Sequence, residues 1–434
     1  MRITKQLNFE GVAIMNRNTA DNGRHQGHGH SHDAGRSHGQ GRFDDRPVPA
    51  ISDDLNEDRL SRHLEEGRAW ERRGGPEGAE AALAYIRTEL ESRGLPVTIH
   101  ECDVYVPPSD PDAPGDWRRI RFPMTNIVPD GGTALFVLAG GRGDASFLVE
   151  MARLLHRHRN ELSHGVRVAW WNGGGEVGFG PAEWYADSHF DLLRSRCLAY
   201  FNVDPLGGRS CSGYEPYATA ELADWGRSMV ERAGGHEAEP APLPRDADGG
   251  FLGVGLPCIS FLPPSMAQGP DEMNQNDLVE RTGFYANALF DLCAHPRAPL
   301  DMMTVADVLW GELQVLQKEV GGAFDFGEAG EAVKELVVVL EDREEEHAEM
   351  EAGDLNRKML NMCHLLNPAL YTENGPFGRD AGGNRGVLPG PRRALALNRL
   401  DPESGEWKAL RARLVQERNR LCAAISRAIL VGRG

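Results

Sequence analysis

One stretch in the first half of the chain constrains the fold most, because it reads as a strand, a glycine-rich turn, a helix and a second strand. Residues 166–171 form a short β-prone run, and the glycines of residues 172–180 cannot continue it. Pro181 suits the first turn of a single helix that should lead to the next strand. Residues 197–203 form that strand, and Asp204 follows its carboxyl end. Open α/β sheets build their sites at such ends, so chemistry is expected here.

Length and charge narrow the classes of function. At 434 residues and 40% hydrophobic content, the chain is long enough for two folded units. Its 65 acidic and 47 basic residues give a net charge of −18, which disfavours binding to nucleic acid and to anionic membranes. The seven cysteines are scattered without a Cys-x-x-Cys pair, as expected for free thiols in a reducing cytoplasm. No stretch has the roughly 20 apolar residues that a membrane-spanning helix needs.

Composition divides the chain into three parts. Residues 1–50 are rich in glycine and polar residues, so we expect a disordered tail. Residues 51–300 alternate strand and helix patterns, which predicts an α/β domain with a mainly parallel mixed sheet flanked by helices. Residues 301–434 show helical spacing only, which predicts an all-α domain. The tail carries an imidazole cluster that could bind a divalent metal, a solvated linker being the alternative; it includes His28, His30 and His32.

Further segments have the pattern of single elements. The spacing predicts helices over 77–93, 144–158 and 218–233, and strands over 97–106, 119–128, 133–139 and 257–262. Pro123 is expected to break the second of these strands, because proline cannot donate to a ladder. Later helices are expected over 305–320, 331–346, 355–366 and 406–430. The last of them carries an apolar stripe of Leu410, Leu414, Leu421 and Ile425.

Short motifs on both sides of the central unit point to a known family. They are His-Leu-Glu-Glu at 63–66, Pro-Glu-Gly-Ala at 76–79, Thr-Asn-Ile-Val at 125–128 and Gly-Leu-Pro at 255–257. In this order they resemble the zinc aminopeptidases of metallopeptidase family 28. The carboxyl-terminal part carries Leu-Asn-Arg at 355–357, Leu-Tyr-Thr at 370–372, Leu-Pro-Gly at 388–390 and Arg-Asn-Arg at 418–420. It resembles the helical domain of glutamate carboxypeptidase II and transferrin receptor.

The resemblance implies two zinc ions about a bridging water, with a glutamate as general base. The family's His-x-Asp motif should follow residues 135–138, where the sequence continues Ala-Gly-Gly. Ungapped alignment puts Gly140 at the bridging aspartate, and Asp144 could replace it only with a shifted gap. The family's Trp-x-Gly-Glu-Glu reads Trp-Asn-Gly-Gly-Gly-Glu at 171–176, so Glu176 is the one acid left for base or ligand.

The other implied positions are filled unevenly. Asp204 completes an intact Asn-x-Asp motif and is the clean ligand candidate, and Asn274 stands where the last histidine ligand is expected. No histidine falls on a ligand position, so a two-zinc site is not expected. One zinc or another divalent metal at Asp204, with Asp144 and Glu176, is the alternative. The remaining cleft candidates are Asn172, Asp246 and Asp248.

The acids also have purely structural interpretations. Glu176 would be favoured by the dipole of the helix that follows it, and Asp204 by hydrogen bonds at a strand end. Asp246 and Asp248 suit a turn in a glycine-rich loop. The Gly-x-Gly-x-x-Gly pattern at 173–178 formally fits a dinucleotide fingerprint, but Glu176 would place negative charge beside the pyrophosphate.

Three hypotheses for function follow. The first is an aminopeptidase-family homologue that is not a conventional peptidase and acts as a binding or assembly protein. The second is a repurposed enzyme that uses the cleft acids on a small amino-acid- or peptide-like substrate. The third is a metal-dependent peptidase or amidohydrolase with an atypical site. We expect an amino-acid- or peptide-like ligand and a homodimer, with neither nucleic acid nor membrane as a partner.

Overall fold

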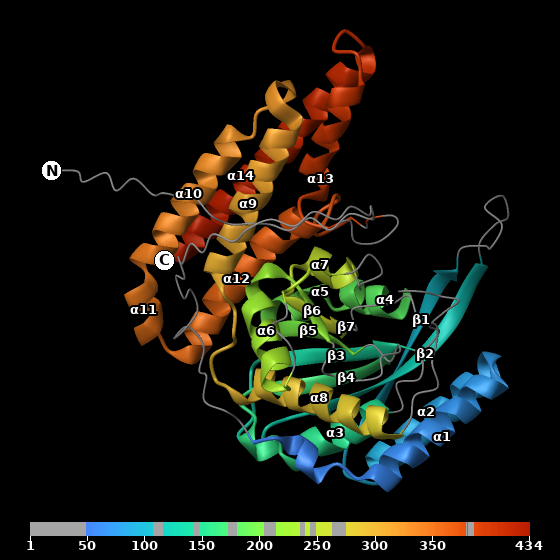
Figure 1. Cartoon of the computed structure of the whole chain (residues 1–434). Helices are drawn as coiled ribbons and strands as arrows, with labels where there is room; N and C mark the ends of the chain where they lie inside the picture. Colours follow the sequence, from blue (N-terminus) through green and yellow to red (C-terminus); the bar gives the residue numbers. More distant parts are fainter. Residues whose placement is uncertain are drawn as a thin grey trace, which may run out of the picture.

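The structure, a computed structural model, joins a sheet-containing α/β unit to an elongated bundle of helices (Figure 1). It describes residues 49–106, 116–142, 147–171, 180–203, 214–234, 239–243, 249–262, 275–378, 380 and 386–434. One continuous cluster of buried apolar side chains runs through both parts. The fold class expected from the alternating pattern is confirmed: a mixed sheet with helices on both faces is followed by helices alone.

The sheet has seven strands in the order β1-β2-β4-β3-β5-β7-β6. Its centre is parallel, because β4, β3, β5 and β7 run in one direction, whereas β1, β2 and β6 pair antiparallel at the two sides. The strands are β1 (Val97–Val106), β2 (Asp116–Ile127), β3 (Phe136–Arg142), β4 (Gly165–Trp171), β5 (Cys197–Val203), β6 (Glu215–Ala218) and β7 (Cys258–Leu262).

Helices cover both faces of this sheet (Figure 1). α3 and α8 lie on one face, while α4, α5 and α7 lie on the other. Apolar side chains point inward from both layers: Phe147 and Leu154 of α3 are buried on the first face, and Phe251 of α7 on the second. The helices are α1 (Glu57–Arg73), α2 (Gly75–Glu91), α3 (Phe147–Arg157), α4 (Gly180–Ser188), α5 (Phe190–Arg196), α6 (Ala223–Arg232), α7 (Gly249–Val254) and α8 (Gln275–Ala294).

Three local predictions are wrong. β2 runs through Pro123, because β2 pairs with β4 only from Met124 onward, so the missing N–H costs no bond on that side. The helix after the turn is divided at His189, whose backbone (φ −122°, ψ 26°) leaves the helical region. The helix expected over 218–233 is shorter, since Glu215–Ala218 forms the edge strand β6 and α6 begins at Ala223.

The helical part follows the predicted spacing, except that the helix expected over 331–346 is divided at Arg343 into two helices. The last helix, α14, packs along α10 and α12, and three members of its apolar stripe, Leu414, Leu421 and Ile425, are fully buried within the bundle. Among the helices of the described residues, none combines the length and apolarity needed to cross a lipid bilayer. The bundle consists of α9 (Met302–Val320), α10 (Gly327–Asp342), α11 (Glu344–Glu349), α12 (Ala352–Tyr371), α13 (Pro389–Arg392) and α14 (Gly405–Arg433).

Helix α12 of the bundle packs against the α/β unit. Gly255 has a positive φ of 91°, and a Cβ there would lie 2.7 Å from the Cα of His364, so only glycine fits between α7 and α12. Beside it, the buried carboxylate of Glu221 accepts hydrogen bonds from Thr219 Oγ1 (2.9 Å) and Asn367 Nδ2 (2.6 Å). Burial raises the pKa of Glu221, which favours its neutral form.

Candidate functional site at the carboxyl ends of the parallel strands

The four parallel strands end at one edge of the sheet, at Arg142, Trp171, Val203 and Leu262. In the sequence, the candidate residues at 144, 172, 176 and 204 come soon after the ends of β3, β4 and β5, as the expected α/β topology requires. Asn274 comes later after β7, and Asp246 and Asp248 precede that strand. The candidate site residues themselves lie outside the described residues, so their roles stay predictions; they are Asp144, Asn172, Glu176, Asp204, Asp246, Asp248 and Asn274, and in the tail His28, His30 and His32.

The position implied for the bridging aspartate is described, and it is closed. Gly140 of β3 lies under the indole of Trp171, the last residue of the neighbouring β4. A Cβ built on Gly140 would lie 2.1 Å from Nε1 of Trp171 and 2.7 Å from Cε2, far inside any real contact. A carboxylate at this position therefore has no room while Trp171 keeps its place.

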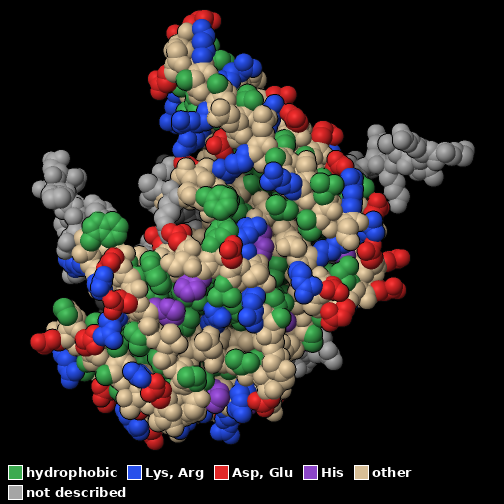
Figure 2. Space-filling model, turned by 180° about the vertical axis from the view of Figure 1, so that it is seen from behind, with side chains coloured by type: hydrophobic (Ala, Val, Ile, Leu, Met, Phe, Trp, Pro, Cys, Tyr) green, Lys and Arg blue, Asp and Glu red, His purple; other side chains and the backbone are tan. Residues whose placement is uncertain are grey.

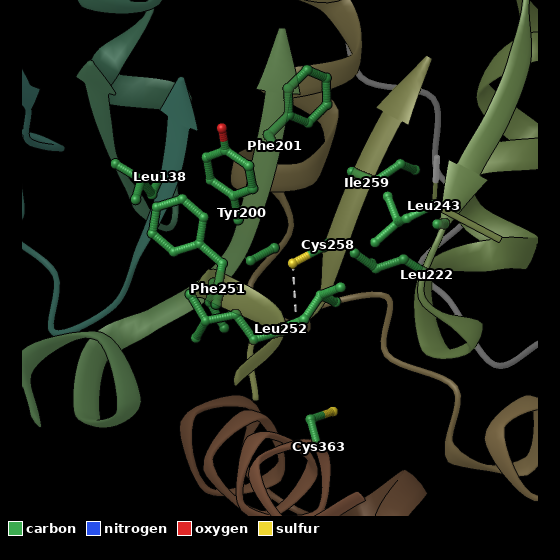
Figure 3. Close-up of a cluster of buried hydrophobic side chains, with 14 of the residues drawn as sticks. Leu138, Tyr200, Phe201, Leu222, Leu243, Phe251, Leu252, Cys258, Ile259 and Cys363 are labelled. Atoms are coloured by element: carbon green, nitrogen blue, oxygen red, sulfur yellow. Dashed lines mark hydrogen bonds between the residues drawn. The ribbon is translucent and has the colours of Figure 1, made fainter. Parts of the chain in front are cut away.

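Aromatic side chains fill the layer above this part of the sheet. The ring of Tyr200 stacks on Phe251 with centroids 4.1 Å apart, and Figure 3 shows both rings beside Leu138. Trp171 is 5.3 Å from Phe122 and 6.3 Å from Phe251, again between ring centroids. All four aromatic side chains are at most 2% exposed, so the layer beside the position implied for the bridging aspartate is packed core.

Polar atoms in this layer bond mainly to one another. Trp171 Nε1 donates to Tyr200 Oη (3.2 Å), and Tyr200 Oη donates to Asn202 Oδ1 (3.5 Å). Asn202 Nδ2 in turn donates to Ser260 Oγ on β7 (3.3 Å). This row crosses from β4 to β7 and consists of neutral groups, which cannot balance the charge of a divalent ion.

Of the positions that the resemblance implies for metal ligands, that of Gly140 lies among the described residues, and there an indole takes the space that a side chain would need. Within the part of the chain that the structure describes, no three His, Cys, Asp or Glu side chains lie close enough to share a metal ion. Two buried histidines elsewhere in the α/β unit have other contacts: His63 Nδ1 bonds to Tyr85 Oη (2.7 Å), and His164 Nε2, just before the start of β4, bonds to the carbonyl of Pro296 (3.1 Å). Burial lowers the pKa of His164 to about 4, so that ring is neutral.

Sequence reasoning missed the residues that occupy this place. It treated Gly140 as a missing ligand and did not identify Trp171, Tyr200 and Asn202 as its neighbours. The sequence does hold a pattern that could have predicted this contact. A tryptophan ends one strand, and two adjacent glycines in the neighbouring strand leave space for its ring. The register that brings them together, with Gly140 opposite Ala169 and Asn202, is set by tertiary structure.

Comparisons with known proteins add a likeness in fold. No protein-family model matches the sequence, and no curated protein matches it. Among solved structures, the chain is similar to an aminopeptidase from Aneurinibacillus sp. strain AM-1, with 11% identity, a TM-score of 0.46, and 56% of this chain and 95% of the other covered. It is also similar to a glutaminyl cyclase from Porphyromonas gingivalis, with 15% identity, a TM-score of 0.43, and 55% and 98% covered. A Zn-dependent exopeptidase from Parabacteroides distasonis shows 13% identity, a TM-score of 0.42, and 56% and 99% covered.

Proposed function

We propose that this chain is not a conventional zinc peptidase and acts as a binding or assembly protein built on an aminopeptidase-like α/β unit. The observation that carries the proposal is the contact between Gly140 and Trp171, because it fills the place of a bridging ligand with an indole ring. The sequence supports it, since no histidine stands at a position where the resemblance implies a ligand.

The ligand class follows from the same edge of the sheet. An amino-acid- or peptide-like molecule carries amide and charged groups, which suit the acids and asparagines that the sequence places after the strands, among them Asn172, Asp204 and Asn274. A repurposed enzyme that uses Glu176 and Asp204 as acid and base would draw on the same residues. The two functions differ in whether bound ligand is turned over.

Two measurements on one preparation test the proposal. The chain without residues 1–50 removes the histidine-rich tail from metal analysis, and the full chain serves as its control. We expect less than one tightly bound zinc per truncated chain, and no chelator-sensitive hydrolysis of aminoacyl reporters. Two tightly bound zincs, or turnover that disappears in Asp204→Ala, would refute the proposal and restore a peptidase. One bound metal with turnover of a small substrate would favour the repurposed enzyme.

A thermal-shift screen with free amino acids and short peptides tests binding directly. A ligand that binds the folded chain raises the melting temperature in a concentration-dependent way. We expect such a rise for at least one amino-acid- or peptide-like compound, and its reduction in Asp204→Asn. If no compound raises the melting temperature, only the assembly role remains of this proposal. Measuring the oligomeric state of the chain tests that role.

A further inference from the structure

Arg167 is a half-buried basic residue of the α/β unit whose partners among the described residues are uncharged. It lies on β4, on the sheet face covered by α4, and its half-buried guanidinium lies 4.1 Å from the ring centre of Phe136. Nη1 donates to the hydroxyl of Tyr185 (3.1 Å). No carboxylate among the described residues pairs with it, although arginine offers five N–H donors.

Other arginines of this unit show what pairing looks like here. Arg153 binds Glu150 at 2.8 Å, and Arg121 binds Glu80 at 2.6 Å. The chain has 65 acidic residues against 47 basic ones, so acids are plentiful. Among the described residues, the partners of this half-buried arginine are a phenol and an aromatic ring, so no carboxylate of the described part balances its positive charge. Such a group attracts anions.

Two imidazoles lie beside the same tyrosine. His189 stacks on Tyr185 with ring centroids 4.1 Å apart, and His100 meets the ring of His189 edge-on at 5.8 Å. His189 Nδ1 lies 3.2 Å from the Tyr185 carbonyl, so Nδ1 carries the proton and Nε2 is the free nitrogen of the neutral ring. Both rings are half-buried. On the back of the molecule, histidine, hydrophobic and basic side chains gather over the α/β unit (Figure 2).

The charge of Arg167 reaches both imidazoles. The pKa of His100 is lowered by burial, by His189 and by Arg167, and the pKa of His189 is lowered by burial and by Arg167, against its backbone hydrogen bond. An anion held by Arg167 would reverse this influence, because negative charge favours the protonated imidazole. Protonated His100 and His189 would then add N–H donors to the bound group.

We propose that Arg167, His100 and His189 form a binding site for an oxyanion, namely the carboxylate or phosphate group of a small molecule. Arg167 supplies the fixed charge and a planar fork of donors that matches two oxygen atoms. The two imidazoles supply donors that appear on binding, and Trp184, which lies 6.3 Å from His100 between ring centroids, supplies an aromatic wall. Arg167 lies near the amino-terminal end of β4, away from the carboxyl ends of the parallel strands, so the site is independent of the function proposed above.

Nuclear magnetic resonance of the histidine ring protons tests this site on the full chain. Resonances of His100 and His189 are assigned by their loss in His100→Gln and His189→Gln. Sodium phosphate and sodium acetate are titrated at constant pH and ionic strength in separate samples, which distinguishes a phosphate site from a carboxylate site. We expect both resonances to move saturably toward the protonated position with at least one of the two anions.

Arginine variants decide whether Arg167 holds the anion. Arg167→Gln should weaken binding by about tenfold or more, the factor expected for a lost charged hydrogen bond. Arg196→Gln is the matched control, because Arg196 lies in the same unit and bonds only to the carbonyls of Ala134 and Thr133. It should bind like the unmodified chain. If Arg167→Gln does not fold, Arg167→Lys keeps the charge without the fork and should still bind more weakly.

Two results would overturn the proposal. One is the absence of a saturable shift at His100 and His189 with either anion. The other is unchanged anion affinity in the folded Arg167 variant.

Discussion

Glu150 of α3 is a fully buried carboxylate that contacts several basic side chains. Its carboxylate is fully buried and accepts hydrogen bonds from Arg153 Nε (2.9 Å) and Nη2 (2.8 Å). Arg59 Nε lies 3.4 Å away and the backbone N–H of Asn56 3.3 Å away, so the carboxylate ties α3 to the start of α1. Glu150→Gln keeps the size of the side chain but leaves two arginines without their counter-charge.

The pKa of Glu150 gives the size of the effect. Burial alone would raise it, but the His63 imidazole 3.9 Å away, the hydrogen bonds from Arg153 and the charges of Arg153 and Arg59 lower it from 4.5 to about 2. This gap corresponds to about 3 kcal/mol of folding free energy, similar to the roughly 3–5 kcal/mol measured when one partner of a buried ion pair is removed. Because the folded-state pKa is the lower one, this stabilisation is complete above pH 4.5 and is lost as the pH falls toward 2.

Urea unfolding of both chains at several pH values is the assay. At pH 7 we expect Glu150→Gln to lose about 3 kcal/mol of unfolding free energy, and at pH 3 only about 1 kcal/mol. The matched control is Glu91→Gln, which removes an exposed i,i+4 pair with Arg87 and should cost at most about 0.5 kcal/mol. A loss no larger than that of the control, or a loss independent of pH, would refute the reasoning.

Three further predictions concern the sheet edge, the junction and the assembly. Gly140→Ala should lower the unfolding free energy by about 1–3 kcal/mol, because the added methyl group clashes with Trp171. Adding Trp171→Leu should recover part of that loss, and additive losses in a double-mutant cycle would show that the two residues do not compete for the same space. Because the pKa of Glu221 is raised in the folded state, its contribution to stability decreases as the pH rises from the ordinary value of 4.5 toward the folded-state pKa. In denaturant titrations, Glu221→Gln should therefore lose less unfolding free energy with rising pH than the unmodified chain. An equal dependence of unfolding free energy on pH in both chains would contradict this. The homodimer predicted from the helical part should appear in light scattering as twice the 47.7 kDa chain mass, whereas a concentration-independent monomer would disprove it.

Periodicity alone determined much of the fold. The apolar run at 197–203 coincides with β5, because a strand buried on both faces needs no partner information to be recognised. Three of the four residues in the predicted stripe of the last helix are fully buried, since 3.6-residue spacing places them on one face, whereas Leu410 is only partly buried. Local signals failed where neighbours decide the outcome: Pro123 lies inside β2 because β4 starts pairing one residue later.

For the candidate site, too, the sequence determined some features and the tertiary structure others. The sequence by itself determined that histidines are missing from the implied ligand positions, and that acids and asparagines follow the parallel strands. It could not show what occupies the place of a ligand, because residues 140 and 171 are separated by a helix and meet only through the parallel register of β3 and β4. The tertiary structure alone decided that an indole covers Gly140 and that Arg167 is left beside two imidazoles, since contacts across strands depend on register and on the layer of helices above them.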